Sequence, residues 1–290
     1  MILILLSSNP AIADEFKVAV RAHKGIEHGL KQWNPTVTLL SEKIKNHTFT
    51  LVPIVSLNEL TVAAGEKKFH FVLTNPSSYV EIQQLHGASA LATLNNKRKN
   101  TAQSTFGSVI FTHVHNTDIV SIQDLKNKKL IAVSKPAFGG WRVAWQEMLA
   151  HGFNPQTDLD ELLFAKSRTQ PEVVEAVLNK KAHAGVVRTD LLERLADKGK
   201  IDMRYLRIIN NQDIHEFPFF LSTQLYPEWA FAALSHVPEP VVQQVSAALM
   251  SIDKNTDASK AGKYISWLAP LDYNGVKNLM KELQVGPYAQ

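Results

Sequence analysis

The sequence predicts an α/β protein with two lobes, and three observations support this. Strand-like and helix-like segments alternate: a strand over Phe16–Arg21, helical spacing over Gly25–Trp33 that resumes over Thr36–Ile44, and a second strand over Phe49–Val55. Glycine and polar residues stand where helices are expected to begin after strands. The chain has 290 residues, 45% of them hydrophobic, which is enough for two separate cores.

The elements beyond this first βαβ unit follow the same alternation. A helix is expected at about Leu57–Gly65, and a buried strand over Phe69–Thr74 then leads through polar residues into a helix over Tyr79–His86. The remaining expected strands are Ala88–Leu94, Gly107–His113, Leu130–Val133, Leu163–Ala165 and Ala184–Val187, and the expected closing helices are Val237–Ser251, Ala258–Trp267 and Val276–Leu283. Alternating elements predict parallel sheets, in which ligands bind at the carboxyl ends of the strands.

Composition and charge exclude several function classes. The formal net charge is +4, and the longest basic clusters, Lys97–Lys99 and Lys126–Lys129, are short enough to be solvated turns, so we expect no nucleic-acid partner. A mildly basic balance favours small acidic ligands. The chain contains no cysteine, which excludes disulfides, thiolate metal sites and a cysteine nucleophile.

The first thirteen residues predict export. An apolar run, Met1–Leu6, is followed by Ala11-Ile12-Ala13, a small-x-small pattern typical of signal-peptidase cleavage. We therefore expect residues 1–13 to be a signal peptide, Asp14 to begin the mature chain, and the protein to work in the periplasm or another extracytoplasmic space. The alternative is that this run forms a buried first strand.

The turn Lys135–Arg142 is the strongest local signal for a binding site. It follows an apolar strand and opens a helix with two glycines and an arginine. A helix N-terminus presents free N–H groups and the positive end of the helix dipole, which suits a small anion. The alternative is a tight turn whose glycines serve only to adopt positive φ.

Five sequence pieces, in this order and spacing, resemble the phosphate/phosphonate-type periplasmic binding protein family, and most closely its branch of sensor domains from tetrathionate-sensor-like histidine kinases. The pieces are Phe71–Tyr79, Lys135–Arg142, Gly185–Glu193, Leu221–Trp229 and Leu283–Tyr288. The resemblance implies a type 2 periplasmic-binding-protein fold with a ligand cleft between two α/β lobes. It also implies that residues 14–110 and 210–290 form the first lobe and residues 111–209 the second.

Departures from the family pattern bear on the ligand and on the role. Ala137-Phe138-Gly139 stands at the family's hydroxyl run, Leu57 and Thr74 stand about where tyrosines are usual, and Gln170 replaces a histidine. These changes disfavour a phosphonate and suit the sensor branch. The resemblance thus implies the ligand-binding sensor domain of a membrane-bound histidine kinase, coupled to a transmembrane signalling module. The alternative is the solute-binding component of an ABC transporter, partnered with its permease.

The expected ligand is a small anion: a phosphorus or sulfur oxyanion, another oxoanion, or a carboxylate. Arg142, Arg188 and Arg21 are expected to hold it, because each guanidinium can fork onto an oxyanion; the alternative is that they pair with Glu147 or Asp190. The complete set of expected ligand-binding residues is Arg21, His23, Asn75, Ser77, Ser78, Tyr79, Phe138, Gly139, Gly140, Trp141, Arg142, Gln170, Arg188 and Thr189.

No segment predicts catalysis or a bound cofactor. There is no Gly-x-Ser-x-Gly elbow, no nucleotide-binding glycine loop and no zinc-protease helix. His113 and His115 could share one strand face as a metal pair, but no third ligand is spaced nearby, so a solvated or crossover-strand placement is favoured. We therefore expect a binding protein with neither metal nor cofactor.

Overall fold

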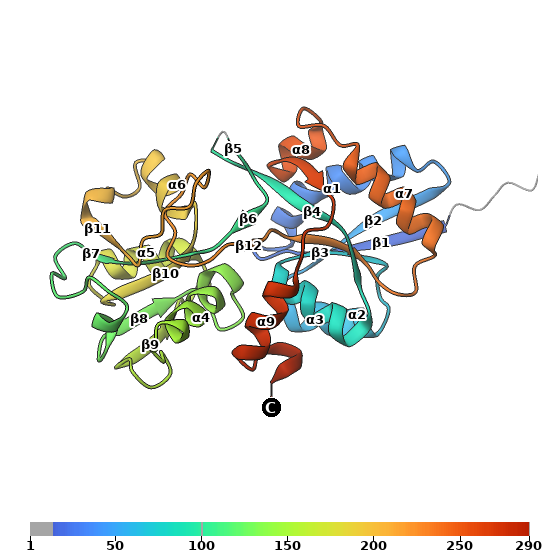
Figure 1. Cartoon of the computed structure of the whole chain (residues 1–290). Helices are drawn as coiled ribbons and strands as arrows, with labels where there is room; N and C mark the ends of the chain where they lie inside the picture. The colour runs from blue at the N-terminus through green and yellow to red at the C-terminus, as the bar shows by residue number, and fades with distance from the viewer. Residues whose placement is uncertain (1–13, 100, 290) are drawn as a thin grey trace, which may run out of the picture.

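The computed structural model describes residues 14–99 and 101–289, so the predicted signal peptide lies outside the described residues. The described chain forms two α/β lobes, which confirms the predicted fold class (Figure 1). In the described ranges no helix has the length and apolar character needed to cross a membrane.

The first lobe is built on a mixed sheet with strand order β14-β4-β13-β3-β1-β2 and β5 beside β4. The strands are β1 (Asp14–Arg21), β2 (His47–Ile54), β3 (Phe71–Thr74), β4 (Ser89–Arg98), β5 (Thr101–Gln103), β13 (Ala230–Ala233) and β14 (Tyr264–Leu268). The helices are α1 (Ile26–Lys43), α2 (Leu57–Gly65), α3 (Pro76–His86), α7 (Glu239–Met250), α8 (Asp257–Gly262) and α9 (Asn274–Glu282). Strands β2, β1 and β3 are parallel, so their carboxyl ends share one edge.

The second lobe is built on a five-stranded sheet with the order β11-β7-β10-β8-β9. Its strands are β7 (Ser108–His113), β8 (Lys129–Ala132), β9 (Glu161–Phe164), β10 (Ala184–Arg188) and β11 (Leu206–Ile209), and its helices are α4 (Val143–Ala150), α5 (Gln170–Leu178) and α6 (Leu191–Asp197). Strands β9, β8 and β10 are parallel, so this sheet also ends several strands at one edge.

Two chain segments join the lobes and pair with each other as a short antiparallel ribbon, β6 (Thr105–Phe106) with β12 (Tyr226–Pro227). The ribbon lies between the two sheets in Figure 1. The predicted lobe boundaries at residues 110/111 and 209/210 stay predictions. Strand β7, which follows the ribbon, begins at Ser108 and therefore includes residues on both sides of the first boundary.

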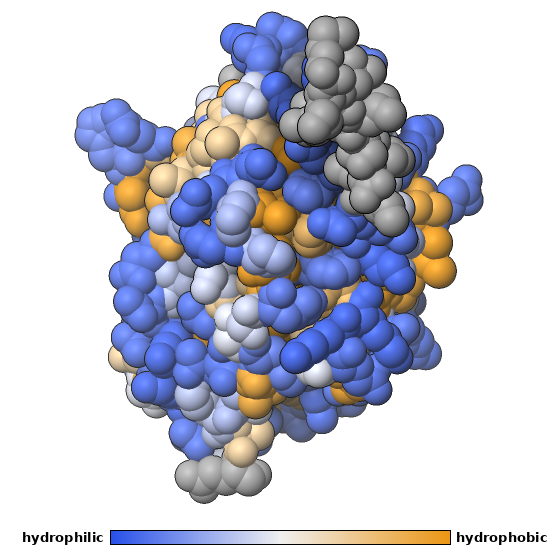
Figure 2. Space-filling view, turned by 90° about the vertical axis from the view of Figure 1, so that its right-hand side faces the viewer, coloured by the Kyte–Doolittle hydropathy of each residue, from blue (hydrophilic) through white to orange (hydrophobic). Residues whose placement is uncertain are grey.

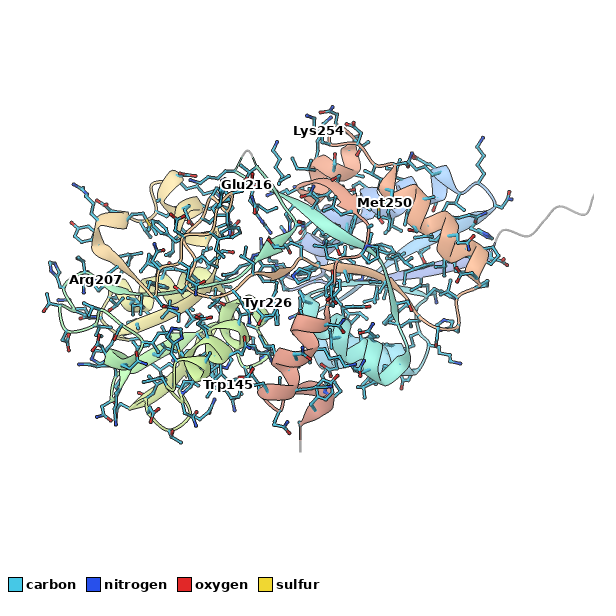
Figure 3. The ribbon with its side chains drawn as sticks, viewed as in Figure 1. Trp145, Arg207, Glu216, Tyr226, Met250 and Lys254 are labelled. Carbon is cyan, nitrogen blue, oxygen red and sulfur yellow. The ribbon has the colours of Figure 1, made fainter. Side chains whose placement is uncertain are left out.

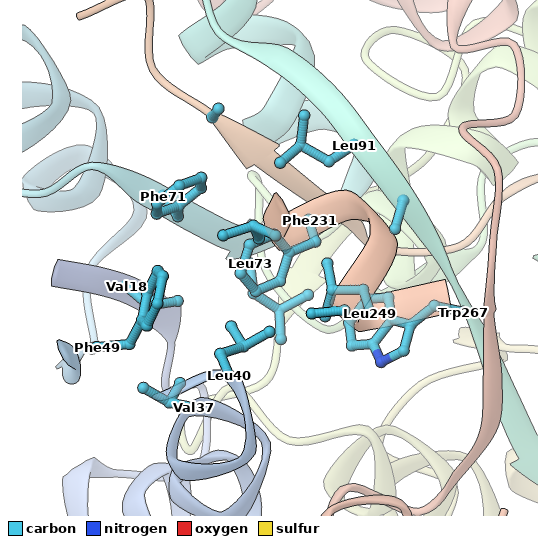
Figure 4. Packing of buried hydrophobic residues seen from close by; sticks show 14 of the residues in the cluster. Val18, Val37, Leu40, Phe49, Phe71, Leu73, Leu91, Phe231, Leu249 and Trp267 are labelled. Atoms are coloured by element: carbon cyan, nitrogen blue, oxygen red, sulfur yellow. The ribbon is translucent and has the colours of Figure 1, made fainter. Parts of the chain in front are cut away.

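The first-lobe core contains apolar side chains from the sheet and from the helices that pack on it. Val18 and Phe71 from the sheet meet Leu40 of α1, while Phe231 packs edge-on to Trp267 with ring centroids 5.8 Å apart (Figure 4). The outer end of this lobe is mostly hydrophilic, with scattered hydrophobic residues (Figure 2). The apolar residues of the strands thus lie in the core of the lobe.

Two segments differ from the sequence-based expectation. Helix α1 continues through Pro35 as one helix instead of two, and five of its residues are buried against the lobe. The helix expected over Ala258–Trp267 is wrong beyond Gly262: Lys263 adopts a left-handed conformation with φ 58°, and Tyr264–Leu268 pairs with β4. Aromatic residues in that segment favour a strand once an open sheet edge is available.

Candidate functional site

The carboxyl ends of β1 and β3 place two polar side chains side by side. The parallel register pairs Val20 with Leu73, so Arg21 and Thr74 are the next residues along the two strands, and Thr74 pairs with Ala230 of β13 on its other side. Arg21 Nη1 and Thr74 Oγ1 are both buried, and neither has a hydrogen-bond partner in the described part of the chain. Unpaired buried donors of this kind are costly and therefore mark a place where another group is expected.

Helix α3 starts directly after Thr74 and adds a third unpaired atom. Asn75 caps the helix, because its Oδ1 accepts hydrogen bonds from the Ser78 N–H at 3.1 Å and from the Ser77 hydroxyl at 3.0 Å. Pro76 occupies the first turn, where its missing N–H costs nothing. The Ser78 hydroxyl is buried without a partner at this helix N-terminus.

Tyr79 has a different role from the one expected. Its hydroxyl accepts hydrogen bonds from Gln83 Nε2 at 2.9 Å and from the Ala90 N–H at 3.1 Å, and its ring packs against Tyr273 inside the first lobe. The side chain therefore fixes α3 against β4.

The turn before α4 is a wide π-type turn over Phe138–Arg142. Neither of its glycines has positive φ, so the alternative of a tight turn that needs glycine only for positive φ is wrong. Instead, a Cβ on Gly139 would lie 2.6 Å from the Phe106 ring, and a Cβ on Gly140 would lie 2.5 Å from Val133. The glycines allow the start of the helix to approach the connecting ribbon and the second sheet.

The two aromatic residues of this turn are packed inside the protein. Trp141 is 1% exposed and stacks on Trp145 in the core of the second lobe, with ring centroids 5.7 Å apart. Phe138 packs edge-on against Phe106 and Tyr226, and Figure 3 shows Tyr226 between the lobes. Both rings hold the turn in position, and the Trp141 ring packs against Trp145 and Phe164 in the core of the second lobe.

Arg142 carries a fourth unpaired atom. Its Nε is buried without a partner, and no carboxylate among the described residues lies within ion-pair distance of its guanidinium. Burial lowers the pKa of Arg142, and the charge of Glu81 on α3 partly opposes this effect. The expected alternative partner, Glu147, instead accepts hydrogen bonds from Asn210 and Gln212.

Arg188, at the end of β10, is already paired. Its guanidinium contacts the carboxylate of Glu228 and lies 4.0 Å above the centre of the Phe106 ring. Glu228 is completely buried and also accepts a hydrogen bond from Asn96 of β4. Gln170 Oε1 accepts the Arg188 N–H at 2.8 Å, which positions the strand end, while Arg188 Nε remains buried without a partner.

Thr189, the next residue, bonds to the backbone of the ribbon. Its hydroxyl accepts the Gly107 N–H at 3.3 Å, and the side chain is buried. It therefore holds the second lobe to the connecting segment.

His23 follows β1 of the first lobe, in surroundings rich in positive charge that include Arg188 of the second lobe. Its ring meets Trp229 edge-on at 5.8 Å, next to Glu228 in sequence. The side chain keeps exposed surface, yet desolvation by the surrounding protein, followed by the charges of Lys24 and Arg21, lowers its pKa to about 4. Exposed surface combined with desolvation is expected for a side chain that lines a concave site.

The sequence analysis did not identify several members of this site. Thr74 was noted only as a replacement for a tyrosine, although its place before a capped helix could have marked it. Glu228 lies within the Leu221–Trp229 piece, but nothing in the sequence indicates its pairing with Arg188, because the two stand 40 residues apart and only the fold brings them together. Two surface hollows, of about 680 and 450 Å³, adjoin α7 and contain none of these residues. Within the described ranges, no group of three or more His, Cys, Asp or Glu residues is arranged to hold a metal ion.

A known sensor protein is similar to almost the whole of this chain. The tetrathionate sensor histidine kinase TtrS of Salmonella typhimurium is 27% identical over 279 residues, which is 96% of this chain and 45% of that protein, so the chain spans less than half of this relative.

Solved structures of binding proteins share the fold. The structure of PhnD1 from Prochlorococcus marinus in complex with methylphosphonate matches with a TM-score of 0.69 at 12% identity, covering 94% of this chain and 99% of that one. A binding protein component of an ABC phosphonate transporter from Pseudomonas aeruginosa matches with a TM-score of 0.70 at 12% identity, covering 94% and 87%.

These likenesses confirm the two-lobed periplasmic-binding-protein fold expected from the sequence. The family model that describes the periplasmic substrate-binding protein of phosphonate ABC transporters matches residues 26–275, most of the chain. Such proteins work outside the cytoplasm, as expected for this chain. The chain is a member of this periplasmic substrate-binding protein family.

Proposed function

We propose that this domain binds a small anion between its two lobes, and that it does so without chemical change to the ligand. One observation carries the proposal. Five buried atoms at strand ends and helix starts of the two lobes have no hydrogen-bond partner among the described residues: Arg21 Nη1, Thr74 Oγ1, Ser78 Oγ, Arg142 Nε and Arg188 Nε.

The chemistry of these five atoms favours an oxyanion. All five can donate a hydrogen bond, and three belong to guanidinium groups that stay protonated. Charge-assisted hydrogen bonds to such groups contribute about 1.5–3 kcal/mol each, whereas a buried donor left unpaired costs about 1–3 kcal/mol. An anion with several oxygens would satisfy donors from both lobes at once and so stabilise one arrangement of the lobes over others.

We further propose that binding serves signalling. The relative TtrS, whose name describes a tetrathionate sensor, matches almost the whole of this chain. The turn that precedes α4 has Ala137-Phe138-Gly139, with no hydroxyl side chain. By the family resemblance, phosphonate binders are expected to have several hydroxyl side chains there. Transport is the second candidate, favoured by the likeness to phosphonate-binding proteins.

Isothermal titration calorimetry tests anion binding directly, with tetrathionate, methylphosphonate, ethanesulfonate and acetate as probes. We expect at least one of them to bind, and Arg142→Gln to weaken that binding at least about tenfold, because a charged hydrogen-bond partner is lost. Arg204→Gln is the matched control, since the Arg204 side chain is 89% exposed in the second lobe and pairs with Asp202. Binding of none of these four anions, or unchanged affinity in both Arg142→Gln and Arg21→Gln, would contradict the proposal.

Deleting the gene in its host separates the two roles. Loss of ligand-induced transcription, with growth on the ligand unchanged, is the result expected for a sensor. Loss of growth on the ligand as a sole source, with transcription unchanged, would assign the chain to transport.

A further inference from the structure

Two aromatic side chains stand beside the strand-end donors of the first lobe. His23 follows β1, two residues after Arg21, and its ring meets the Trp229 ring edge-on, with centroids 5.8 Å apart. Trp229 precedes β13, whose Ala230 pairs with Thr74 of β3. Strand β3 lies between β1 and β13 in the sheet, so the two rings meet across the end of β3.

The strand directions put this pair of rings at the edge of the sheet that carries the donors. Strand β13 is antiparallel to β3, so its first residue lies beside the last residue of β3 and close to the end of the parallel strand β1. Arg21 Nη1 and Thr74 Oγ1, both buried without a partner among the described residues, belong to the strand ends that the rings of His23 and Trp229 bridge.

Trp229 is also close to a donor of the second lobe. Its N–H donates to Glu228 Oε2 at 3.3 Å, and the Glu228 carboxylate pairs with the guanidinium of Arg188 at the end of β10. Arg188 Nε is one of the five atoms without a partner in the described ranges. Trp229 is therefore one residue away from a contact that joins the lobes.

Both rings keep surface that the rest of the protein does not cover. Trp229 packs on the first-lobe core yet is only partly buried, and His23 is exposed. Three of the other four tryptophans, Trp33, Trp141 and Trp267, are at most 4% exposed. Desolvation lowers the pKa of His23 to about 4, so its ring is uncharged at neutral pH. Aromatic surface beside a few placed donors is the usual lining of a site for a ligand with both apolar and polar parts.

The carboxylates near the two rings bear on the charge of a ligand. Glu228 is paired with a guanidinium of the second lobe, and Arg98 Nη2 lies 4.0 Å from it. Asp190 Oδ2 lies 3.3 Å from Arg98 Nε and 3.1 Å from Arg194 Nε. Glu193 of α6 accepts a backbone N–H with Oε1, whereas its Oε2 is buried without a partner among the described residues. The carboxylate next to the rings is thus not free to hold an amine, which favours an uncharged group there.

We propose that His23 and Trp229 form an aromatic wall on which an uncharged part of the ligand packs, so that the ligand is an oxyanion attached to an apolar or polarisable body rather than a bare ion such as sulfate or phosphate. This inference rests on the proposed function, in which the strand-end donors hold the charged group. The charged group fixes the position of the ligand, and the body adds affinity and selects among anions of equal charge.

Matched short and long anions test the inference by calorimetry on the whole domain. The pairs are methane- and butanesulfonate, methyl- and butylphosphonate, and acetate and pentanoate. We expect the butyl form to bind about tenfold or more tighter for at least one charged group, because each buried methylene can contribute about a fourfold gain. Equal affinity within every pair, or binding of none of the six, would overturn the inference. Tighter binding of 4-aminobutanesulfonate than of butanesulfonate would also overturn it, because a carboxylate such as Glu193 would then hold an amine.

Variants locate the gain at the aromatic wall. Trp229→Ala should weaken the favoured butyl anion about tenfold and its methyl partner less than about twofold, because only the body loses its contact, whereas Arg142→Gln should weaken both. Trp229→Phe should keep much of the difference. His23→Ala, at an exposed side chain, makes the same test if Trp229→Ala does not fold. Equal losses for the methyl and butyl forms would overturn the wall alone, because the methyl form would still bind and the proposed function would stand.

Fluorescence shows whether the ligand reaches the Trp229 ring. The butyl anion should change the emission of the natural protein, and Trp229→Phe should remove most of that change. Trp145→Phe is the matched control, because Trp145 of α4 is the other partly buried tryptophan among the described residues; the change should persist there. An undiminished change in Trp229→Phe would place the ligand away from the wall and overturn the inference.

Discussion

Arg188 and Arg142 stand on the same lobe and were expected to play the same part, yet their surroundings differ. Arg188 meets the buried carboxylate of Glu228 and the face of Phe106. Arg142 has an unpartnered Nε and only the more distant charge of Glu81 to compensate it. One arginine therefore has its counter-ion within the chain, and the other forms no ion pair with any residue that the structure describes.

The difference separates two tasks that an interlobe site must perform. Glu228 follows the ribbon strand β12 and joins Arg188 of the second lobe to Asn96 of the first, so this pair ties the lobes together. Arg142, Ser78 and Thr74 have no such partner and gain theirs from what enters the site. We infer that Arg188 orients the lobes and that Arg142 contributes more to ligand affinity.

Removing the Glu228 charge gives the largest expected effect. Glu228→Gln keeps the shape of the side chain but leaves Arg188 buried without its counter-ion, which should lower the free energy of unfolding by about 3–5 kcal/mol. Urea denaturation measures it, with the exposed Glu239→Gln in α7 as control. A loss below about 1 kcal/mol, the range of surface pairs, would show that the Glu228 pair does not tie the lobes.

A methyl group at Gly139 tests the packing that brings Arg188 and the turn together. The added Cβ of Gly139→Ala would meet the Phe106 ring at 2.6 Å, and overpacking of this kind costs about 1–3 kcal/mol. Gly275→Ala is the matched control: its nearest neighbour is Tyr226 at 3.7 Å and it lies in α9, so alanine there should stabilise by about 0.5–1 kcal/mol. Thermal unfolding of both variants should show shifts of opposite sign; two shifts of the same sign would mean that the turn tolerates the methyl group.

The sequence predicted the architecture far better than the charge pairing. Strand and helix periodicity located most elements as far as β4 and the strands β7, β8 and β10, because burial of one face leaves a local pattern, whereas α5, α6, β11 and β13 were not predicted. The helix predicted over Ala258–Trp267 ends before Lys263, because this residue is left-handed and the next residues pair with the open edge of β4. Neither feature is encoded within the segment alone.

The site was predictable to the extent that it depends on strand ends. Arg21, Ser78 and Arg142 stand where the alternation of elements placed them, whereas Tyr79 and Trp141 turned inward to fill cores. The direction of a side chain depends on packing partners far away in sequence. The pairing of Arg188 with Glu228 is a further example, since two lobes must be assembled before it exists.

Asp190 offers a test in which stability and affinity should change in opposite directions. Its φ of 74° is left-handed, a conformation that asparagine also adopts readily, so Asp190→Asn removes the charge without backbone strain. Arg98 and Arg194 lose their shared carboxylate, so we expect the free energy of unfolding to fall. We expect anion affinity to rise about three- to tenfold, equivalent to about 1 kcal/mol. Calorimetry with the best-binding anion measures this, and weaker binding would mean that Asp190 orients the arginines for the ligand.

The smallest expected effect is a dependence on pH through His23. Its pKa is lowered to about 4 by desolvation and then by neighbouring cations, which are Lys24, Arg21, His28 and Arg188. A group with a lowered pKa in the folded state makes stability fall as pH drops from about 6.5 to 4, because the unfolded chain binds the proton more readily. A bound anion offsets the cations and raises the pKa again, so proton uptake should accompany binding and affinity should increase as pH falls through this window.

Calorimetry at pH 5.5 in buffers of different ionisation enthalpy measures that uptake. We expect a fraction of a proton per bound anion in the natural protein and less in His23→Gln, while at pH 8 the two proteins should match. His28 also has a lowered pKa and makes His28→Gln the control for a nearby histidine at the start of α1. Equal uptake by the natural protein and His23→Gln would assign the proton elsewhere. It would also show that anion binding is not coupled to protonation of His23.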